Sequence, residues 1–316
     1  MKTSRTIIVS ALSTFFLAIS CFFVLPAKAR KLDKPDLIQS FPVGQGPIGI
    51  AFDGANIWTA NLWYNIVTKL RASDGALQGT FPVGRGPWEV AFDGANIWVT
   101  NTDDGTATKL RASDGALQGT FSVGGSPRGI LFDGANIWTA NSGSNSVTKL
   151  RASDGVLLGT YSVGSWPNEL AFDGANVWVT NTGNSSVTKL RASDGRQLFT
   201  VNAGAAPLGI VFDGSSIWVA NSYAHTVTKL RLGDGAVEGT TQVGENPQEL
   251  AFDGTHVWVG NYYPDDTVMK LRRSNGAVQH IYAVGINPEG IVFDGSSIWT
   301  ANYGSSSVSK ISRTPP

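Results

Sequence analysis

The chain has 316 residues, only 15% of them charged, and a formal net charge of zero, so its composition suits neither nucleic acid nor an anionic membrane surface. Its 37 glycines and 10 tryptophans are typical of many short strands joined by tight turns, and no stretch after residue 30 has a helical period. The length fits two ordinary domains or one large all-β domain.

Residues 1–29 are predicted to form an export signal. Lys2 and Arg5 precede an apolar run over residues 7–25, and a small-x-small cleavage site ends at Ala29. We expect cleavage after Ala29, which places the protein in the periplasm or outside the cell, with no membrane insertion. Because the run approaches the length that spans a bilayer, an uncleaved membrane anchor is the alternative.

Cleavage would also change the composition of the chain. It removes three of the 24 bases and none of the 24 acids, which leaves a net charge of −3. It also removes Cys21, the one cysteine, so the exported protein has no disulfide, no thiolate metal site and no cysteine nucleophile. The stability of the exported chain must therefore come from packing.

An internal repeat follows a short linker at residues 30–36. The tripeptide Phe-Asp-Gly recurs with a period of 40 residues, with one extra residue in the sixth unit. Its seven copies begin at Phe52, Phe92, Phe132, Phe172, Phe212, Phe252 and Phe293. A period of this length with this many copies indicates a repeat architecture.

Each unit contains four short β-type runs separated by turns. In the second unit they cover residues 89–92, 96–101, 106–112 and 117–123, with Asp-Gly hairpin turns between them. A lone four-stranded sheet cannot bury both faces, so the units must pack against one another. We predict an all-β fold, a seven-bladed β-propeller with four antiparallel strands per blade. One tryptophan per blade provides the packing between blades: Trp58, Trp98, Trp138, Trp178, Trp218, Trp258 and Trp299.

The two ends of the repeat region complement each other. Residues 37–44 match the fourth-strand segment 77–84, whereas the last unit has only three strands and ends near Ile311. The N-terminal strand is therefore expected to complete the last blade and close the ring, which leaves no exposed sheet edge. The predicted propeller covers residues 37–312, with a tail at 313–316, and we expect a monomer.

Several repeated polar residues suit the scaffold better than a binding site. Lys69 and Arg71 alternate along the third strand, where the turn acids Asp53 and Asp74 can pair with them. Residues 44–49 match the pattern G-x-G-x-x-G, but a strand follows them in place of the helix that dinucleotide binding needs. One asparagine per unit stands where the second strand enters its loop and can satisfy local backbone groups: Asn61, Asn101, Asn141, Asn181, Asn221, Asn261 and Asn302.

The repeat resembles that of a known family. Trp98-Val99-Thr100-Asn101, followed by a Ser/Asn-rich loop, Val-Thr-Lys-Leu, Asp-Gly and Val-Gly-x-x-Pro, is similar to the YVTN repeat of YncE-like seven-bladed propellers, with Trp in place of Tyr. This likeness covers residues 37–312 and implies a seven-bladed propeller. A more distant resemblance is to the streptogramin (virginiamycin B) lyases, also seven-bladed, whose repeats read closer to Trp-Phe-Thr-Glu.

Function is expected where the units differ. The Asp-Gly turns hardly change, whereas the loops between strands two and three and the loops that lead into each blade vary freely, and both kinds of variable loop lie on one side of the disc. Exposed aromatics gathered on one face suit a glycan, an apolar small molecule or a protein partner. Eight of the tryptophans and tyrosines fall in these loops: Trp63, Trp88, Trp166, Tyr64, Tyr223, Tyr262, Tyr263 and Tyr303.

Acidic residues alternate on the same side. The second residue after the proline that begins each unit is glycine in odd-numbered units and glutamate at Glu89, Glu169 and Glu249, while Glu289 lies one place earlier in the last unit. The alternation indicates duplication of two-blade units. Because several carboxylates facing one channel repel each other, they must be protonated, hydrated or matched by a cation. Glu89, Glu169 and Glu249 are therefore candidate ligands for Ca²⁺ or Mg²⁺.

These features predict an exported, non-enzymatic binding propeller that engages a small ligand, a glycan or a protein partner through the variable loops and the channel mouth. The candidate binding residues are Trp63, Arg85, Trp88, Glu89, Trp166, Glu169, Tyr223, Tyr263 and Glu289. No Gly-x-Ser-x-Gly elbow, Walker loop or His-Glu-x-x-His motif occurs in the sequence. The alternative is a metal-dependent lyase or lactonase resembling the streptogramin lyases, with His225 as base and Glu245 and Glu249 assisting.

Overall fold

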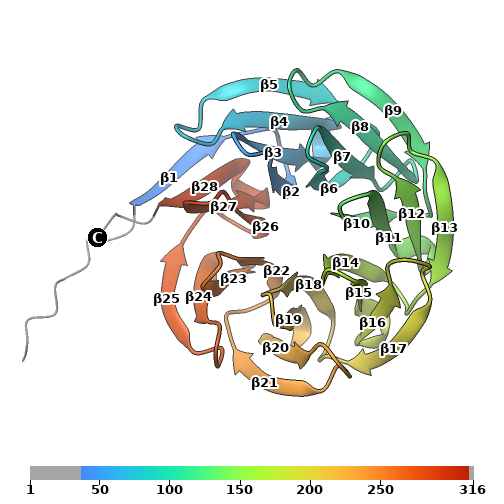
Figure 1. Ribbon diagram of the computed structural model, residues 1–316. Coiled ribbons are helices and arrows are strands. Elements are labelled where there is room, and N and C mark those ends of the chain that lie inside the picture. The colour runs from blue at the N-terminus through green and yellow to red at the C-terminus, as the bar shows by residue number, and fades with distance from the viewer. Residues whose placement is uncertain (1–36, 313–316) are drawn as a thin grey trace, which may run out of the picture. The chain divides into compact units, whose positions relative to one another are not determined.

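The computed structural model describes residues 37–312, which form seven four-stranded antiparallel sheets. The sheets follow one another around a central channel as the blades of a β-propeller, with the first strand of each blade innermost (Figure 1). The predicted fold class is confirmed. The predicted export signal, the linker and the C-terminal tail lie outside the described residues. Over residues 37–312, no helix is long and apolar enough to cross a membrane.

The first four blades are built by sixteen consecutive strands. Blade 1 comprises β2 (Pro47–Phe52), β3 (Asn56–Asn61), β4 (Ile66–Arg71) and β5 (Leu77–Pro82). Blade 2 comprises β6 (Pro87–Phe92), β7 (Asn96–Asn101), β8 (Thr106–Arg111) and β9 (Leu117–Ser122). Blade 3 comprises β10 (Pro127–Phe132), β11 (Asn136–Asn141), β12 (Ser146–Arg151) and β13 (Leu157–Ser162). Blade 4 comprises β14 (Pro167–Phe172), β15 (Asn176–Asn181), β16 (Ser186–Arg191) and β17 (Gln197–Asn202).

The last three blades follow the same order. Blade 5 comprises β18 (Pro207–Phe212), β19 (Ser216–Asn221), β20 (Thr226–Arg231) and β21 (Val237–Gln242). Blade 6 comprises β22 (Pro247–Phe252), β23 (His256–Asn261), β24 (Thr267–Arg272) and β25 (Val278–Ala283). Blade 7 comprises β26 (Pro288–Phe293), β27 (Ser297–Asn302), β28 (Ser307–Ser312) and β1 (Leu37–Pro42).

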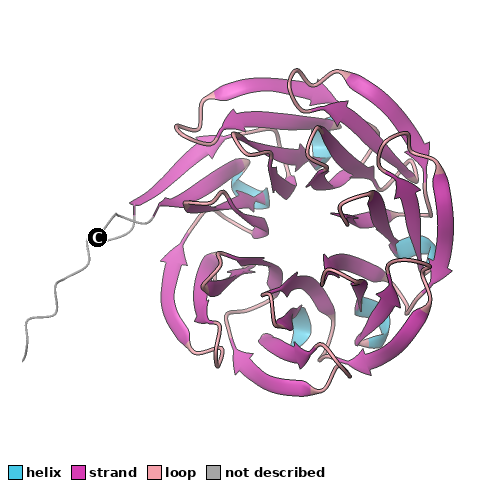
Figure 2. Ribbon diagram, in the orientation of Figure 1, coloured by secondary structure: helices cyan, strands magenta, loops and turns pink. Residues whose placement is uncertain are grey.

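Short helical turns connect the second and third strands of five blades (Figure 2). They are η1 (Leu62–Tyr64), η2 (Ser142–Ser144), η3 (Thr182–Asn184), η4 (Ser222–Ala224) and η5 (Tyr303–Ser305). Each ends at a residue in the left-handed conformation, which reverses the chain into the third strand.

The strands of the second unit lie close to their predicted positions. The main difference is β6, which begins at Pro87, two residues earlier than expected. Proline is tolerated at the first residue of a strand because its missing N–H is not needed for the ladder there. Of the two added residues, Trp88 lines the channel cavity described below.

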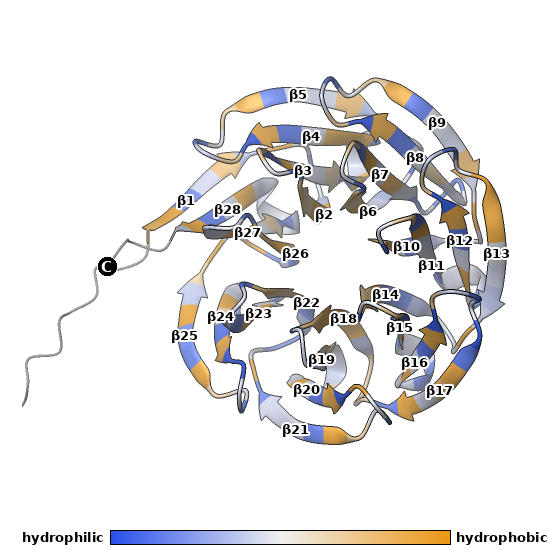
Figure 3. Ribbon diagram, in the orientation of Figure 1, coloured by the Kyte–Doolittle hydropathy of each residue, from blue (hydrophilic) through white to orange (hydrophobic). Residues whose placement is uncertain are grey.

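The ring closes as predicted. β1 pairs antiparallel with β28, with Leu37 opposite Ser312 and Pro42 opposite Ser307, so the strand nearest the N-terminus becomes the outer strand of the last blade (Figure 1). The pairing leaves no blade of the described chain with only three strands. Hydropathy alternates along the outer strands, as in β5, because one face packs on the blade and the other faces solvent (Figure 3).

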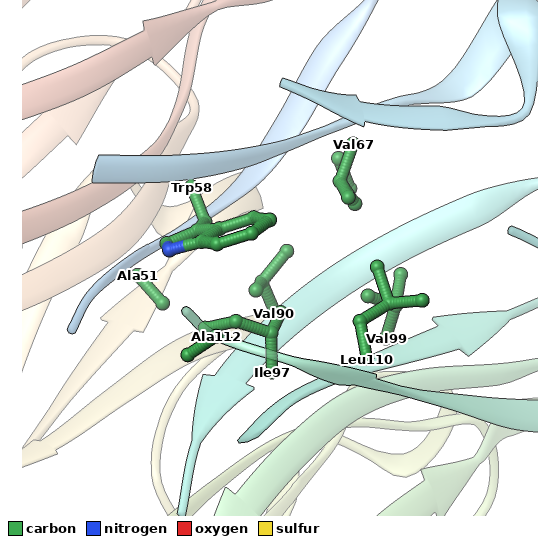
Figure 4. Packing of buried hydrophobic residues seen from close by; sticks show 9 residues of the cluster. Ala51, Trp58, Val67, Val90, Ile97, Val99, Leu110 and Ala112 are labelled. Carbon is green, nitrogen blue, oxygen red and sulfur yellow. The ribbon is translucent and has the colours of Figure 1, made fainter. Parts of the chain in front are cut away.

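The core lies between neighbouring blades. Trp58 of blade 1 packs against Val90, Ile97 and Ala112 of blade 2 (Figure 4). Trp58 and its six equivalents are each no more than 1% exposed, which confirms their predicted role. Burial of each large ring stabilises the fold by roughly 2–3 kcal/mol, and each blade needs its neighbour to achieve it.

Every buried tryptophan is fixed by the aspartate of the Phe-Asp-Gly turn. In blade 1, Trp58 Nε1 donates to Asp53 Oδ2 at 2.8 Å, while Asp53 Oδ1 accepts the N–H groups of Ala55 and Asn56. The same Trp–Asp bond, at 2.7–2.8 Å, occurs in all seven blades. Burial raises the pKa of Asp53, but the bonds from Trp58, Ala55 and Asn56 outweigh it and hold that pKa below its usual value.

The lysine of the third strand connects adjacent blades. Arg71 pairs with Asp74 as expected, at 3.1 Å between Nη1 and Oδ2. Lys69 Nζ instead lies 4.9 Å from the centre of the Trp58 ring and donates to the carbonyl of Ala112 in blade 2 at 2.7 Å. The expected scaffold role of the lysine is thus confirmed, but its main partner is the backbone of the next blade rather than the turn acid.

The repeated asparagines are scaffold residues, as predicted. Asn61 is fully buried, and its Nδ2 donates to Thr68 Oγ1 at 2.9 Å and to the carbonyl of Thr59 at 3.1 Å. Asn101 and Asn181 make the equivalent bonds to the third strands of their own blades. These side chains hold the second strand to the third where the loop begins.

Candidate functional site

A β-bulge opens the inner strand of every blade at the channel mouth. In blade 2, Pro87 pairs with Asn101 and Val90 with Val99, so Trp88 and Glu89 together oppose one residue. Such a bulge bends the strand and redirects its side chains. The equivalent pairs in the other blades are Ile48-Gly49, Arg128-Gly129, Asn168-Glu169, Leu208-Gly209, Gln248-Glu249 and Glu289-Gly290.

The bulged pairs of all seven blades line one cavity of about 210 Å³ in the channel. Four of its side chains are carboxyls and one is a guanidinium. The lining residues are Ile48, Trp88, Glu89, Arg128, Asn168, Glu169, Leu208, Gly209, Gln248, Glu249, Glu289 and Gly290. The structure therefore brings together the four glutamates that the sequence singled out, with Trp88 beside them.

The alternation of glycine and glutamate has a packing reason. A Cβ on Gly49 would lie 2.6 Å from Glu89 Oε1, and a Cβ on Gly129 would lie 2.8 Å from both carboxyl oxygens of Glu169. The backbone of the next blade comes closer still: such a Cβ would lie 2.5 Å from the carbonyl of Trp88 at Gly49 and 2.4 Å from that of Ile48 at Gly290, where the next blade has no glutamate. Glycine in the odd-numbered blades is therefore required by the close approach of the next inner strand, and duplication of two-blade units can explain how the alternation arose.

Burial raises the pKa values of the four carboxyl groups, and repulsion from neighbouring carboxyls raises three of them further. Burial raises the pKa of Glu89 to about 7, against the bonds that its Oε1 accepts from Val90 N and Ile50 N. Burial, together with repulsion from Glu89, raises the pKa of Glu289 to about 8, although Arg128 opposes this. These two groups therefore exchange their protons near neutral pH.

The pKa values of the other two carboxyls are raised as well. The pKa of Glu169 lies well above its usual value because of burial and the charges of Glu249 and Glu89. Burial and the charges of Glu89 and Glu289 do the same to Glu249. A cation entering the cavity would reverse the balance and favour the ionised forms.

Arg128 is the charged cavity residue that the sequence analysis missed, together with the uncharged Asn168, Leu208 and Gln248. Its Cζ lies 4.7 Å from the centre of the Trp88 ring, and its Nε is buried without a hydrogen-bond partner in the part of the chain that the structure describes. Burial lowers the pKa of Arg128, while the charge of Glu289 raises it. Arg128 occupies the same repeat position as Trp88, one residue after the proline, so comparing that column across the units would have found it.

The predicted aromatics form an exposed rim on the variable loops. Trp63 is 62% exposed, Trp166 64%, Tyr223 78% and Tyr263 64%. Trp63 lies 6.5 Å from Tyr303 between ring centres, so two adjacent loops contribute to the rim. These side chains are available to a ligand, but none of the four lines the cavity.

Arg85 belongs to the rim and is already paired. Its Nε donates to Asp104 Oδ1 at 2.7 Å, and its backbone N–H donates to Asp104 Oδ2. Arg85 does not line the cavity. Its role in binding stays a prediction, and its visible contacts order the loop between β7 and β8.

His225 and Glu245 are also placed apart from the cavity. They approach each other, with 3.6 Å between Nε2 and Oε2, whereas Glu249 lines the cavity and they do not. His225 Nδ1 accepts the N–H of Asn246 at 3.1 Å, so the neutral imidazole carries its proton on Nε2.

The repeat shows what the His225 slot does elsewhere. Asn65 and Asn145 occupy the same place, and their side-chain oxygens accept the N–H of Gly86 and Trp166 in the following loops. Asp266 accepts the N–H of Asn287 in the same way. His225 thus performs a loop-holding role that three other blades assign to asparagine or aspartate.

The carboxyls do not form a ready metal site. Oxygen donors suit Ca²⁺ and Mg²⁺, yet no group of three or more His, Cys, Asp or Glu within residues 37–312 is arranged to hold a metal ion. Glu89, Glu169 and Glu249 come from three separate blades around the cavity. Their predicted binding of a divalent ion remains to be measured.

Comparisons with known proteins identify the fold. No protein-family model and no curated protein matches this sequence, so the resemblance to YVTN-repeat propellers stays a prediction. Among solved structures, a streptogramin B lyase is similar with a TM-score of 0.76 and 19% identity, over 88% of this chain and 98% of that one.

Two further solved structures share the architecture. A chain of the hydrazine synthase of Kuenenia stuttgartiensis has a TM-score of 0.71 and 18% identity, over 90% of this chain and 98% of that one. A chain of a mitotic checkpoint complex has a TM-score of 0.78 and 14% identity, over 98% of this chain and 99% of that one. At such identities the likeness shows the β-propeller fold alone.

Proposed function

We propose that this protein is an exported binding propeller that holds a small organic cation in the central cavity, below a rim of exposed aromatic side chains. The observation that carries the proposal is the convergence of Glu89, Glu169, Glu249 and Glu289 from four blades on one cavity of about 210 Å³. A cavity of this size suits a small molecule better than a glycan chain or a protein segment.

The charge of the cavity supports a cationic ligand. With all four carboxyls ionised, Arg128 would balance only one of them, so the empty cavity stays neutral by keeping protons instead. A ligand ammonium or guanidinium group could replace those protons. It would donate several charge-assisted hydrogen bonds to the carboxylates, and these bonds would stabilise the complex. Because the carboxyls are spread around the channel, an extended organic cation fits their placement better than a single metal ion.

The aromatic rim supports the same ligand class. Faces of tryptophan and tyrosine attract cations as well as apolar groups. Trp166 and Tyr223 are exposed on the loops above the cavity, and Trp88 lies inside it against Arg128. A ligand that enters past the rim would therefore meet aromatic faces first and carboxylates afterwards.

Calorimetry tests the proposal directly. We would titrate 1,4-diaminobutane, methylguanidine, tetramethylammonium, CaCl₂ and MgCl₂ into the protein at pH 7.5, in two buffers of different ionisation enthalpy. We expect an organic cation to bind and to release protons, because the carboxyls must ionise to hold it. Binding of Ca²⁺ or Mg²⁺ alone would replace the organic cation with a metal, and no heat from any probe would end the proposal.

Variants locate the site. Glu169→Gln and Glu249→Gln are each expected to weaken binding at least about tenfold, the effect of losing one buried charged partner. Glu245→Gln is the matched control, because Glu245 is exposed on the same face but does not line the cavity. If all three variants lose the same amount of binding affinity, the ligand binds at the rim and not in the cavity.

A metal-dependent lyase or lactonase is the second candidate. The fold likeness to a streptogramin B lyase and the position of Glu249 in the cavity favour it. The test is incubation with cyclic lactones, with and without Mg²⁺. Turnover that depends on Mg²⁺ and is abolished by Glu249→Gln would overturn the binding function, whereas His225→Ala is expected to alter only the loop.

Export is a separate part of the proposal. It is supported by the basic start, the apolar run and the cleavage site of residues 1–29. Sequencing the N-terminus of the protein recovered from the periplasm or the medium should begin at Arg30. Recovery of an intact chain from membranes would establish the uncleaved anchor.

A further inference from the structure

Six of the seven blades place an aromatic ring against their buried tryptophan. The ring comes from the outer strand of the blade, and its centre lies 5.3–5.8 Å from that of the tryptophan. The pairs are Phe41–Trp299, Phe81–Trp58, Phe121–Trp98, Tyr161–Trp138, Phe199–Trp178 and Tyr282–Trp258.

Blade 5 lacks this ring. In blade 1 the ring-bearing residue Phe81 pairs with Val67, and in blade 5 the equivalent pair is Thr241 with Val227. Thr241 therefore stands in the aromatic position of β21. No aromatic ring of β21 therefore packs against Trp218, the buried tryptophan of blade 5.

Blade 4 shows that the position can be filled in another way. There Val201 occupies the aromatic position, and Phe199, two residues earlier on the same face of β17, supplies the ring. The corresponding earlier residue of blade 5 is Gly239. Neither position of β21 can supply a ring.

The space above Gly239 is open. A Cβ on Gly79 or Gly159 would collide with the ring of Phe81 or Tyr161, whereas nothing lies within 4 Å of a Cβ placed on Gly239. A pocket of about 550 Å³ takes the place of the ring. Its lining residues are Trp218, Lys229, Arg231, Ala236, Val237, Glu238, Gly239, Thr241, Ser274 and Asn275.

The lysine of blade 5 is also less tightly held than five of its equivalents. Lys69 donates to the carbonyl of the next blade at 2.7 Å, and four equivalents do so at 2.6–2.7 Å. Lys229 reaches the carbonyl of Arg273 only at 3.4 Å, and its Nζ lies 3.8 Å from Glu238 Oε2. The pocket thus has a tryptophan floor and an ammonium group at its wall.

We propose that this pocket binds a small phenolic compound. Its ring would fill the space that phenylalanine or tyrosine fills in the other blades, against Trp218. Its hydroxyl would lie over Gly239, where the hydroxyl of Tyr161 lies over Gly159 in blade 3, on the ladder position that pairs with Lys229. The repeat itself defines the occupant, because six copies of the same scaffold hold an aromatic ring there.

The probe is p-cresol, which is the tyrosine side chain with a hydrogen in place of the backbone. Titration followed by tryptophan fluorescence and calorimetry should show one site with a Kd of about 1 mM, which is reasonable for a ligand of this size. Toluene should bind at least about threefold more weakly, since it lacks the hydroxyl. Absence of saturable p-cresol binding would overturn the proposal, and equal binding of toluene would overturn the phenolic class.

Two variants provide matched controls. Thr241→Phe fills the pocket from the chain itself, so it should raise Tm and weaken p-cresol binding at least about tenfold. Phe121→Thr gives the outer strand of blade 2 the sequence LQGTTS, close to the VEGTTQ of blade 5. It should lower Tm and raise the number of p-cresol sites from one to two.

A soaked crystal decides the location even if one variant fails to fold. 4-Bromophenol can replace p-cresol, and its bromine gives an anomalous signal. Bromine against Trp218 in blade 5 supports the site. Bromine only elsewhere, or unchanged binding in Thr241→Phe, contradicts it.

Discussion

The two sides of the propeller use buried acids in opposite ways. On the side of the Asp-Gly turns, the carboxylate of Asp133 accepts bonds from Trp138 Nε1 and from the N–H groups of Ala135 and Asn136, so that its pKa stays low despite burial. At the channel mouth, burial wins and the pKa values of Glu89 and Glu289 rise to about 7 and about 8. On the turn side, hydrogen bonds from the chain keep the carboxylate ionised. At the channel mouth, burial and neighbouring carboxyls favour the protonated form.

This contrast separates stability from function. A carboxylate whose partners are all supplied by the chain has nothing left to offer a ligand. Carboxyls whose pKa values are raised by burial and by one another are frequent at functional sites.

The largest effect is expected from removing residues 30–44, because the deletion takes away β1, the outer strand of blade 7. Without β1, the outer edge of β28 loses its partner, and the ring is no longer closed. We expect insoluble or multimeric protein, measured by size-exclusion chromatography and light scattering. A soluble, cooperative, monomeric product would contradict the closure.

Among single substitutions, the largest effect is expected from Asp133→Ala on the turn side. The substitution leaves the buried Trp138 Nε1 and two backbone N–H groups without acceptors. The cost should be about 3 kcal/mol of the free energy of unfolding, measured by urea denaturation at pH 7. A loss below about 1 kcal/mol would show that the hydrogen bonds of the turn acids contribute little to the stability of the fold.

At the channel mouth, stability should depend on pH in the direction opposite to that of ordinary surface acids. Because the folded-state pKa values of Glu89 and Glu289 lie above the usual 4.5, the folded protein binds more protons than the unfolded chain between pH 4.5 and about pH 8. Its free energy of unfolding should therefore fall as pH rises through this window, by as much as about 6 kcal/mol between pH 5 and pH 8 for these two pKa values. Urea denaturation at pH 5 and pH 8 measures the difference, and a flat profile would show that the carboxyls are solvated.

Glu169→Gln is expected to raise the free energy of unfolding, whereas Asp133→Ala is expected to lower it. Glutamine has the size of the protonated acid and needs no proton on folding, whereas glutamate is ionised in the unfolded chain at pH 8 and meets a fold that raises its pKa. At pH 8 we expect stabilisation of about 1 kcal/mol, together with the loss of cation binding proposed above. Destabilisation at pH 8 would assign Glu169 to the scaffold.

The scaffold could be predicted from the sequence because it repeats. Trp58, Asn61 and their equivalents occur in every unit, so their role follows from the period alone. The partner of Lys69 did not follow, because its carbonyl acceptor at Ala112 becomes a neighbour only when blades stack. The four channel glutamates were found because they break the repeat in a regular way.

The rest of the site depends on geometry that spacing does not show. Comparing the units would have singled out Arg128, but its contact with Trp88 follows only from the stacking of blade 3 on blade 2. His225 looked like a free base, yet its Nδ1 is occupied by the N–H of Asn246. The pocket at Thr241 is a missing contact, which becomes visible only after the Phe81–Trp58 packing is known.

The smallest effect is expected at Trp166, where the backbone conformation is unfavourable for a bulky residue. Its φ is 52°, in the left-handed region where Gly46 and Gly86 occupy the same slot at 64° and 65°. A bulky residue in this conformation costs energy, and such strain persists mostly where function needs the side chain. Trp166→Gly should therefore stabilise the protein by about 0.5 kcal/mol while weakening ligand binding, measured by urea denaturation and calorimetry. If the variant is instead destabilised by more than about 1 kcal/mol, the ring packs as scaffold, and the rim of the binding face would have to be drawn without it.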